Sequence, residues 1–193
     1  MSRDHSYLKR LPAEYYRGQA YVHWSMTMQD RKTGWLVPIF YYKFREILTH
    51  ASFRYGFCCP IYCCMPDHLH LLWVGILPTC DQLLAAGYFR KQLNPILAVF
   101  GAQFQEQGYE HVLREDERER SAFEIVFEYI ARNPERAGLV KENGYREYPY
   151  TGCLVPGYPE LKIWDDKFWE RFWRIHAYLQ EHGLTRTESR VSP

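Results

Sequence analysis

Two histidines, His68 and His70, lie two residues apart and offer a way to hold a metal ion. Side chains alternate across a β-strand with a period of two, so both imidazoles project from one face while Leu69 turns into the core. Imidazole is the commonest metal ligand in proteins. The same pair could instead be two packed, hydrogen-bonded polar residues, because this spacing alone carries little information. The choice depends on the surrounding sequence.

Four of the six cysteines cluster just before the two histidines and raise the alternative of a zinc site. They are Cys58, Cys59, Cys63 and Cys64. Structural zinc sites gather cysteines in closely spaced pairs, and Cys59 and Cys63 have a tolerable gap. Adjacent cysteines on a strand face opposite ways, however, so a doublet cannot present both thiols to one ion. The sequence therefore favours reduced thiols that serve as small buried hydrophobic residues.

The composition is that of a folded domain. The chain has 193 residues, of which 47% are hydrophobic and 17% aromatic, and its formal net charge is +1. This length suits one well-buried domain with an appendage. The charge argues against a strongly basic nucleic-acid coat, although a balanced total can hide a basic face. We expect a cytosolic protein with no membrane partner, because no apolar run reaches membrane-spanning length and the start Met1–His5 is polar.

The hydrophobic pattern predicts alternating strands and helices. We expect strands at 21–28, 57–65, 68–76 and 109–113, and helices at 38–55, 78–104 and 116–132. Gly56 should end the first helix, and Asn94-Pro95 should interrupt the second, since the residue before a proline avoids helical conformation. This order predicts an α+β fold with a ferredoxin-like split βαβ antiparallel sheet and added C-terminal helices.

The last of these helices carries an aromatic and aliphatic stripe for the core. The stripe consists of Phe123, Phe127 and Ile130. At 100° per residue, Tyr129 lies on the flank of the stripe and Asn133 one turn further on the same side. Pro134 should end the helix, which frees the Asn133 amide to point away from its own backbone. Composition alone does not select Tyr129 among 16 tyrosines, because a flanking tyrosine more often packs than reacts.

Three linked motifs resemble the single-tyrosine HUH transposases, and among them the REP-associated tyrosine transposases of bacteria. The motifs are MPDHLHLL at 65–72, EHVLR at 110–114 and YIARNPERAGLV at 129–140. They follow one another in the order and spacing of that family within residues 21–150. The resemblance implies the HUH nuclease fold, with a transposase domain over residues 1–150 and an aromatic helical tail packed on it over 151–193.

The resemblance also implies roles for individual residues. His68 and His70 would bind a divalent cation, Mg²⁺ or Mn²⁺, and Tyr129 would be the nucleophile that attacks single-stranded DNA. Asn133 would complete the metal site, where the family often has a glutamine. The implied protein is a metal-dependent transposase and endonuclease of the bacterial cytoplasm, associated with the nucleoid and acting as a monomer or homodimer. It would recognise imperfect hairpins of REP-like repeats and rejoin the DNA through a 5′-phosphotyrosine.

The chemistry of these residue types agrees with that assignment. Two neutral imidazoles and one amide oxygen leave open positions on a divalent cation for phosphate oxygens. Phenolate is a better leaving group than an alkoxide, so an incoming 3′-OH can reverse a phosphotyrosine without ATP. Strand transfer thus needs no separate energy source.

Five basic side chains are candidates for contacts with the DNA backbone. They are Arg90, Lys91, Arg114, Arg132 and Arg136. A solvated surface charge is the simpler interpretation of each except Arg114, which belongs to a matched motif. His111 is either a neighbour of the metal site or a packed histidine. Asp67 is expected to serve only in the turn between two strands.

The segment at 164–179 predicts an aromatic helix that packs on the sheet or on another helix, with base stacking as the alternative. Two further functions compete with the transposase. One is a hairpin-binding protein that has lost cleavage. The other is a zinc-stabilised module built on the cysteines between Cys58 and Cys64.

Overall fold

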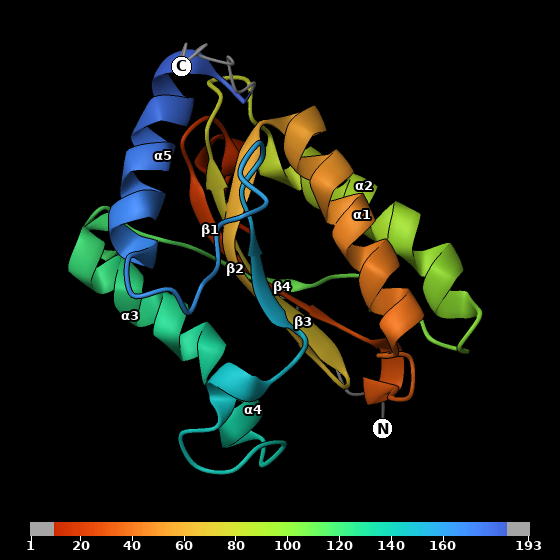
Figure 1. Cartoon of the computed structure of the whole chain (residues 1–193). Helices are drawn as coiled ribbons and strands as arrows, with labels where there is room; N and C mark the ends of the chain where they lie inside the picture. Colours follow the sequence, from red (N-terminus) through yellow and green to blue (C-terminus); the bar gives the residue numbers. More distant parts are fainter. Residues whose placement is uncertain (1–9, 185–193) are drawn as a thin grey trace, which may run out of the picture.

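A five-stranded antiparallel sheet forms the centre of the computed structural model, which describes residues 10–184 (Figure 1). The strands are β1 (Tyr21–Thr27), β2 (Phe57–Met65), β3 (His68–Gly75), β4 (Tyr109–Val112) and β5 (Thr151–Leu154). The helices are α1 (Pro38–Tyr55), α2 (Gln82–Ala98), α3 (Arg120–Ala131), the single turn α4 (Asn133–Arg136) and α5 (Phe168–His182). The predicted features at Met1–His5 and after residue 184 lie outside the described residues.

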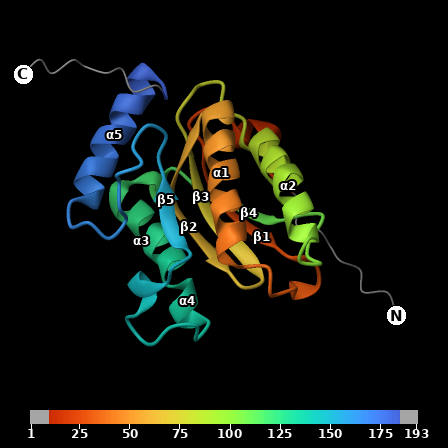
Figure 2. The same cartoon turned by 45° about the vertical axis from the view of Figure 1, so that its right-hand side comes forward.

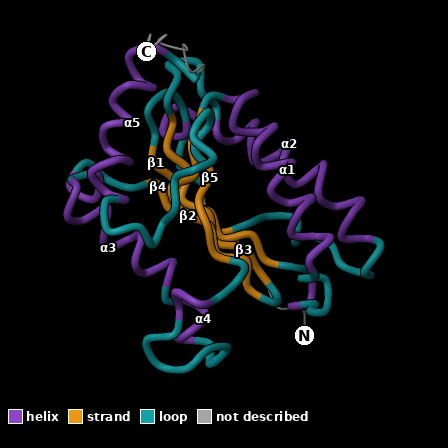
Figure 3. The backbone as a smooth tube through the Cα atoms, in the orientation of Figure 1, coloured by secondary structure: helices purple, strands orange, loops and turns teal. Residues whose placement is uncertain are grey.

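The first four strands and two helices follow the order β1-α1-β2-β3-α2-β4, and these strands lie side by side as β4-β1-β3-β2. This is the predicted ferredoxin-like split βαβ arrangement within an α+β fold. Helices α1 and α2 cover one face of the sheet, and α3 and α5 cover the other (Figures 1 and 3). The predicted α+β sheet is therefore confirmed, with two layers of helices around it.

Strand β5 extends the sheet along β2, in the segment for which only helix was predicted (Figure 2). Its four residues are too few to show a strand period, and Gly152 among them weakens strand propensity. A Cβ atom at Gly152 would lie 2.5 Å from the hydroxyl of Tyr62, so the buried Tyr62 side chain requires a glycine at this position. The sheet thus continues past residue 150, the predicted end of the first domain.

Side chains of β3 alternate between the hydrophobic cores on the two faces of the sheet. Leu69, Leu71 and Trp73 are fully buried against the side of α1 and α2. Their neighbours His68 and His70 project from the opposite face, toward α3, as the period of two predicts. Burial of each large apolar side chain contributes about 2–3 kcal/mol, so the apolar face fixes which face carries the histidines.

The cysteine cluster also divides between the two faces. Cys59 and Cys64 lie in the core under α1 and α2, whereas Cys58 and Cys63 lie in the core under α3 and α5. All four are fully buried, and burial raises the pKa of Cys63 to about 12. Within residues 10–184, no three His, Cys, Asp or Glu side chains form a group that could hold a metal ion. The geometry therefore gives no support to the zinc-stabilised module.

The predicted end of α1 is correct, whereas the predicted start and interruption of α2 are not. Gly56 ends α1 with a left-handed φ of 75°, as expected. Helix α2 begins later than predicted, after Asp81, whose carboxylate accepts hydrogen bonds from two backbone N–H groups of the first turn. It also continues through Pro95, so the predicted interruption is wrong. The proline leaves only the carbonyl of Lys91 without its helical donor, and Lys91 is exposed to water.

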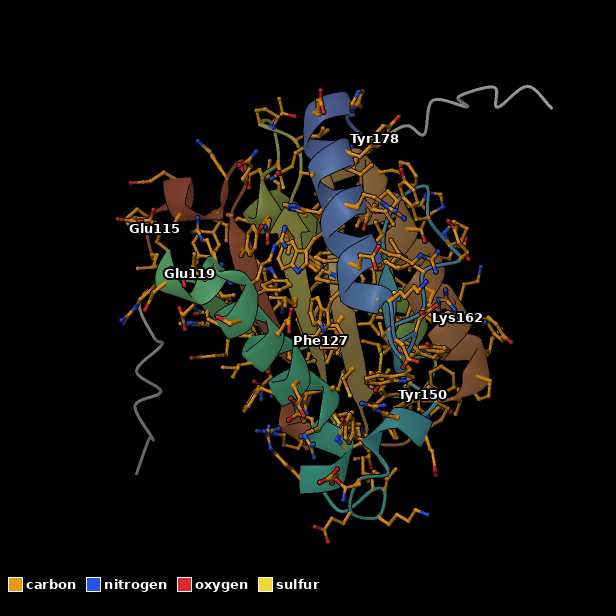
Figure 4. The ribbon with its side chains drawn as sticks, turned by 60° about the vertical axis from the view of Figure 1, so that its left-hand side comes forward. Glu115, Glu119, Phe127, Tyr150, Lys162 and Tyr178 are labelled. Carbon is orange, nitrogen blue, oxygen red and sulfur yellow. The ribbon has the colours of Figure 1, made fainter. Side chains whose placement is uncertain are left out.

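Helix α5 begins at Phe168, four residues later than the predicted aromatic helix, and packs beside α3 (Figure 4). The rings of Phe172 and Phe123 stack with 6.1 Å between centroids and 7° between planes. Trp169 and Trp173 also contact Phe123, so this aromatic surface serves helix packing. None of the helices within residues 10–184 combines the length and the apolar character that a membrane crossing requires.

A buried histidine of α5 predicts how stability depends on pH. His176 lies 3.4 Å from the Tyr21 hydroxyl, and burial lowers its pKa from 6.5 to about 4. The unfolded chain therefore binds more protons between these two values, and the free energy of unfolding falls as the pH falls through that range. From pH 7 to pH 5, we expect His176→Leu to lose about 1–2 kcal/mol less stability than wild type in urea titrations. His50→Leu, at an exposed position on α1, is the control and should follow wild type. Equal losses in His176→Leu and wild type would contradict the assignment.

Candidate active site

Strand β3 begins directly after the tight turn at Pro66-Asp67 and presents both histidines on the α3 side. The Nε2 atoms of His68 and His70 are 3.0 Å apart. Adjacent ligands of an octahedral ion with bonds of about 2.1 Å lie about 3.0 Å apart. The two imidazoles are therefore spaced as neighbouring ligands of one small divalent cation.

Asp67 contacts the ring nitrogen of His68 that faces away from His70. Its Oδ1 lies 2.6 Å from Nδ1 of His68, and its Oδ2 accepts a hydrogen bond from Nη1 of Arg31 at 3.0 Å. Burial alone would raise the pKa of Asp67, but His68 and Arg31 outweigh it and lower that pKa. An ionised carboxylate accepts a hydrogen bond from the protonated Nδ1 and leaves the lone pair of Nε2 free for a metal, as carboxylate–histidine pairs do. The sequence predicted only a turn role for Asp67, which was incomplete.

His23 on β1 lies behind His70 and was missed by the sequence reasoning. Its Nε2 is 3.0 Å from Nδ1 of His70, and the side chain is buried. Burial lowers the pKa of His23 to about 4. Burial also lowers the pKa of His70 to about 2, helped by His23, His68 and Arg136. Both rings are thus neutral at pH 7, the form in which imidazole binds metals. No period within β1 reveals His23, because its role arises only from the pairing of β1 with β3.

Tyr129 lies on α3 beside these histidines, and 48% of its surface is exposed. The ring of His23 meets it edge to face, with centroids 6.2 Å apart. The guanidinium of Arg136 lies over the ring, 4.3 Å from its centroid. Segments that are distant in the sequence therefore meet here, and the ring of His23 contacts both the predicted nucleophile Tyr129 and the predicted ligand His70.

Asn133 does not extend from a frayed helix end as predicted. Helix α3 already ends at Ala131. Pro134 lies in the first turn of a new helix, α4, which begins at Asn133. The Nδ2 atom of Asn133 donates to the backbone carbonyls of Tyr129 and Ile130, at 3.0 and 3.1 Å. These bonds use the amide nitrogen, whereas a metal ligand would be the oxygen Oδ1. Ligation by Asn133 stays a prediction.

Two of the five candidate DNA contacts lie next to the tyrosine. Arg136 donates from Nη1 to the carbonyl of Tyr129 at 3.0 Å, and its side chain is exposed. Arg132 is engaged in the protein itself. It donates to Glu128 at 2.8 Å and to Glu135 at 3.3 Å, and it lies over the ring of Tyr145. Arg136 is therefore the arginine of this pair that is positioned to meet a phosphate.

The other three basic residues lie away from the histidines. Arg90 and Lys91 belong to α2, which covers the opposite face of the sheet. Arg114 follows β4 and is exposed. Tyr109 of β4 lies level with His70 across β1, so Arg114, five residues further, lies about 16 Å along the sheet. The structure does not bring these three side chains to the tyrosine.

His111 pairs with a carboxylate instead of the predicted metal ligands. It lies directly opposite His23 in the β1–β4 register, and its Nε2 is 3.0 Å from Oε1 of Glu117. The same carboxylate accepts a hydrogen bond from the backbone N–H of Arg114 at 2.7 Å. His111 thus helps to fix the chain after β4.

Comparisons with known proteins identify the fold. No family model and no curated protein matches the sequence. A solved structure described as a REP-associated tyrosine transposase bound to a REP hairpin is similar, with a TM-score of 0.61 and 19% sequence identity. The match covers 76% of this chain and 81% of that chain. The chain therefore has the fold of that transposase, in agreement with the predicted α+β architecture.

The hydrogen bonds of Arg90 predict a structural role for this residue. It donates from Nη1 to the carbonyl of Glu106 at 2.7 Å and from Nη2 to the carbonyl of Gln105. Arg90→Ala would leave these carbonyls without their donor, so we expect it to lower the free energy of unfolding by about 1–3 kcal/mol. Lys91→Ala, at the exposed neighbouring position, is the control and should change stability by about 0.5 kcal/mol or less. Urea unfolding compares the two, and equal stability of both variants would refute the anchoring role.

Proposed function

We propose that this protein binds hairpin DNA and cleaves an adjoining single strand by attack of Tyr129, with Mg²⁺ or Mn²⁺ held by His68 and His70. The observation that carries the proposal is the convergence of the two Nε2 atoms, 3.0 Å apart, on the face where Tyr129 lies. The transposase of the same fold was solved with a REP hairpin, which supports hairpin DNA as the substrate class. Strand cleavage and rejoining would make this protein a transposase.

The residues around the phosphate would divide the chemistry between them. A bound divalent cation would supply Lewis-acid polarisation of the scissile phosphate. The Oη atom of Tyr129 forms a bond to phosphorus while the bond from phosphorus to O3′ breaks. The phenol proton passes to solvent, and the departing O3′ takes up a proton. The products are a 5′-phosphotyrosine and a free 3′-OH, which can attack in reverse and restore the phosphodiester.

The surroundings of Tyr129 suit a nucleophile that must reach a DNA strand. Its ring is half exposed, so a strand can approach without a large rearrangement of α3. Arg136 places a positive charge over the ring, where negative charge develops when the phenol loses its proton. The same guanidinium can hold the phosphate beside the attacking oxygen. Position and charge thus favour the same reaction.

Covalent trapping tests the nucleophile and the metal together. With Mn²⁺ and a labelled oligonucleotide that joins a hairpin to a single-stranded flank, wild type should form a protein–DNA adduct that survives denaturing electrophoresis. Tyr129→Phe removes one oxygen and little packing, so the adduct should disappear while hairpin affinity and stability stay close to wild type. EDTA should abolish the adduct in wild type.

Tyr42→Phe provides the matched control, because Tyr42 is also exposed but lies on α1, across the sheet. This variant should form the adduct as wild type does. An adduct that persists in Tyr129→Phe, or that maps to another tyrosine, would show that the nucleophile is misassigned. Hairpin binding by wild type with no adduct would favour the non-cleaving alternative.

The geometry of attack also predicts the strandedness of the cleaved segment. A fixed tyrosine and a fixed cation must grip one phosphodiester in line, and a regular duplex offers little freedom to bend one strand into that position. We therefore expect cleavage in an unpaired flank, with affinity for the hairpin that falls steeply as salt rises. The measurement compares oligonucleotides that are identical except for a complementary strand annealed across the flank. Equal cleavage of both would overturn the single-strand mechanism.

A further inference from the structure

We propose that His23 is a positioning residue that holds His70 in the tautomer able to bind the cation. This inference rests on the metal site of the proposed function and adds a residue to it that none of the three sequence motifs contains. Its basis is one buried hydrogen bond, between Nε2 of His23 and Nδ1 of His70, with 3.0 Å between the nitrogens.

The proton positions follow from the hydrogen bonds on the far sides of the two ligands. The Asp67 carboxylate can only accept, so Nδ1 of His68 carries the proton and Nε2 of His68 has a lone pair. His70 then has two choices. Its proton lies either on Nε2, where it closes a hydrogen bond to His68, or on Nδ1, where it is donated to His23.

Only the second choice makes a cation site. With the proton on Nε2 of His70, the 3.0 Å gap between the two rings is an ordinary N–H···N hydrogen bond and no ion can enter. With the proton on Nδ1, two lone pairs face each other across that gap, and a cation between them relieves their repulsion. An acceptor behind His70 therefore decides whether the pair binds metal, and His23 lies where that acceptor must be.

His23 also contacts the nucleophile, which sets it apart from a residue that only packs. Its ring lies 5.2 Å from the ring of His70 and 6.2 Å from the ring of Tyr129, centroid to centroid. Only 8% of its surface is exposed, so neighbouring side chains hold it in place. His23 on β1 thus contacts both the predicted ligand His70 on β3 and the predicted nucleophile Tyr129 on α3.

Mn²⁺ binding without DNA measures this role apart from catalysis. In isothermal titration calorimetry we expect His23→Leu, which fills the space without an acceptor, to weaken Mn²⁺ binding by about 10- to 100-fold. His23→Gln can accept from Nδ1 through its amide oxygen, so it should restore affinity to within a few-fold of wild type. His176→Leu is the matched control, because His176 is an equally buried histidine on the same side of the sheet that bonds to Tyr21. It should bind Mn²⁺ as wild type does.

Wild-type protein supplies a second measurement that does not depend on a variant folding. Long-range ¹H–¹⁵N correlation spectra of the metal-free protein should show His70 protonated on Nδ1. Protonation on Nε2, or unchanged Mn²⁺ affinity in His23→Leu, would overturn the role of His23 while the metal site stands. Failure of wild type itself to bind Mn²⁺ would instead overturn the proposed metal site, and this inference with it.

Discussion

The register of β3 is the constraint on which the remainder of the molecule depends. Leu69, Leu71 and Trp73 enter the core under α1 and α2, which leaves His68 and His70 on the other face. A slip of one residue would exchange the two sets and bury both imidazoles among aromatic rings. Because Trp73 stacks on Phe57 and meets Phe89 edge to face, that slip would cost several large contacts at once. The hydrophobic core on one side thus determines the polar geometry on the other.

Placement of the tyrosine depends on a second, separate core. Helix α3 lies on the sheet through Phe123 and Phe127, and α5 packs beside it through Phe168 and Phe172. Tyr129 follows on the flank of this stripe and therefore stays half exposed while its helix is held firmly. The C-terminal segment consequently supports the site without supplying a reactive group. It does so twice, because β5 also covers the edge of β2 that precedes the histidine strand.

Local patterns in the sequence were sufficient for α1, β2 and β3, whose boundaries are fixed by Gly56, by the hydrophobic run and by the turn at Pro66-Asp67. The same patterns placed His68 and His70 on one face. They could not reveal His23, whose partner lies 47 residues away, or the bonds from Arg90 to a loop 15 residues later. Propensity misjudged Pro95 because a single lost donor is tolerated where water can replace it. Local rules thus predict elements, whereas pairings between elements determine the site.

Burial shapes the electrostatics of the site in a way that bears on its chemistry. The imidazoles of His70 and His23 are neutral because they are desolvated, and the carboxylate of Asp67 contacts the far side of His68. A cation held by neutral nitrogens gains less from its ligands than one held by carboxylates. Under the proposed function, the DNA phosphate would therefore supply the negative charge that the protein ligands lack. Substrate and cation would then stabilise each other's binding, so that DNA raises the affinity for a cation that the histidines already bind on their own.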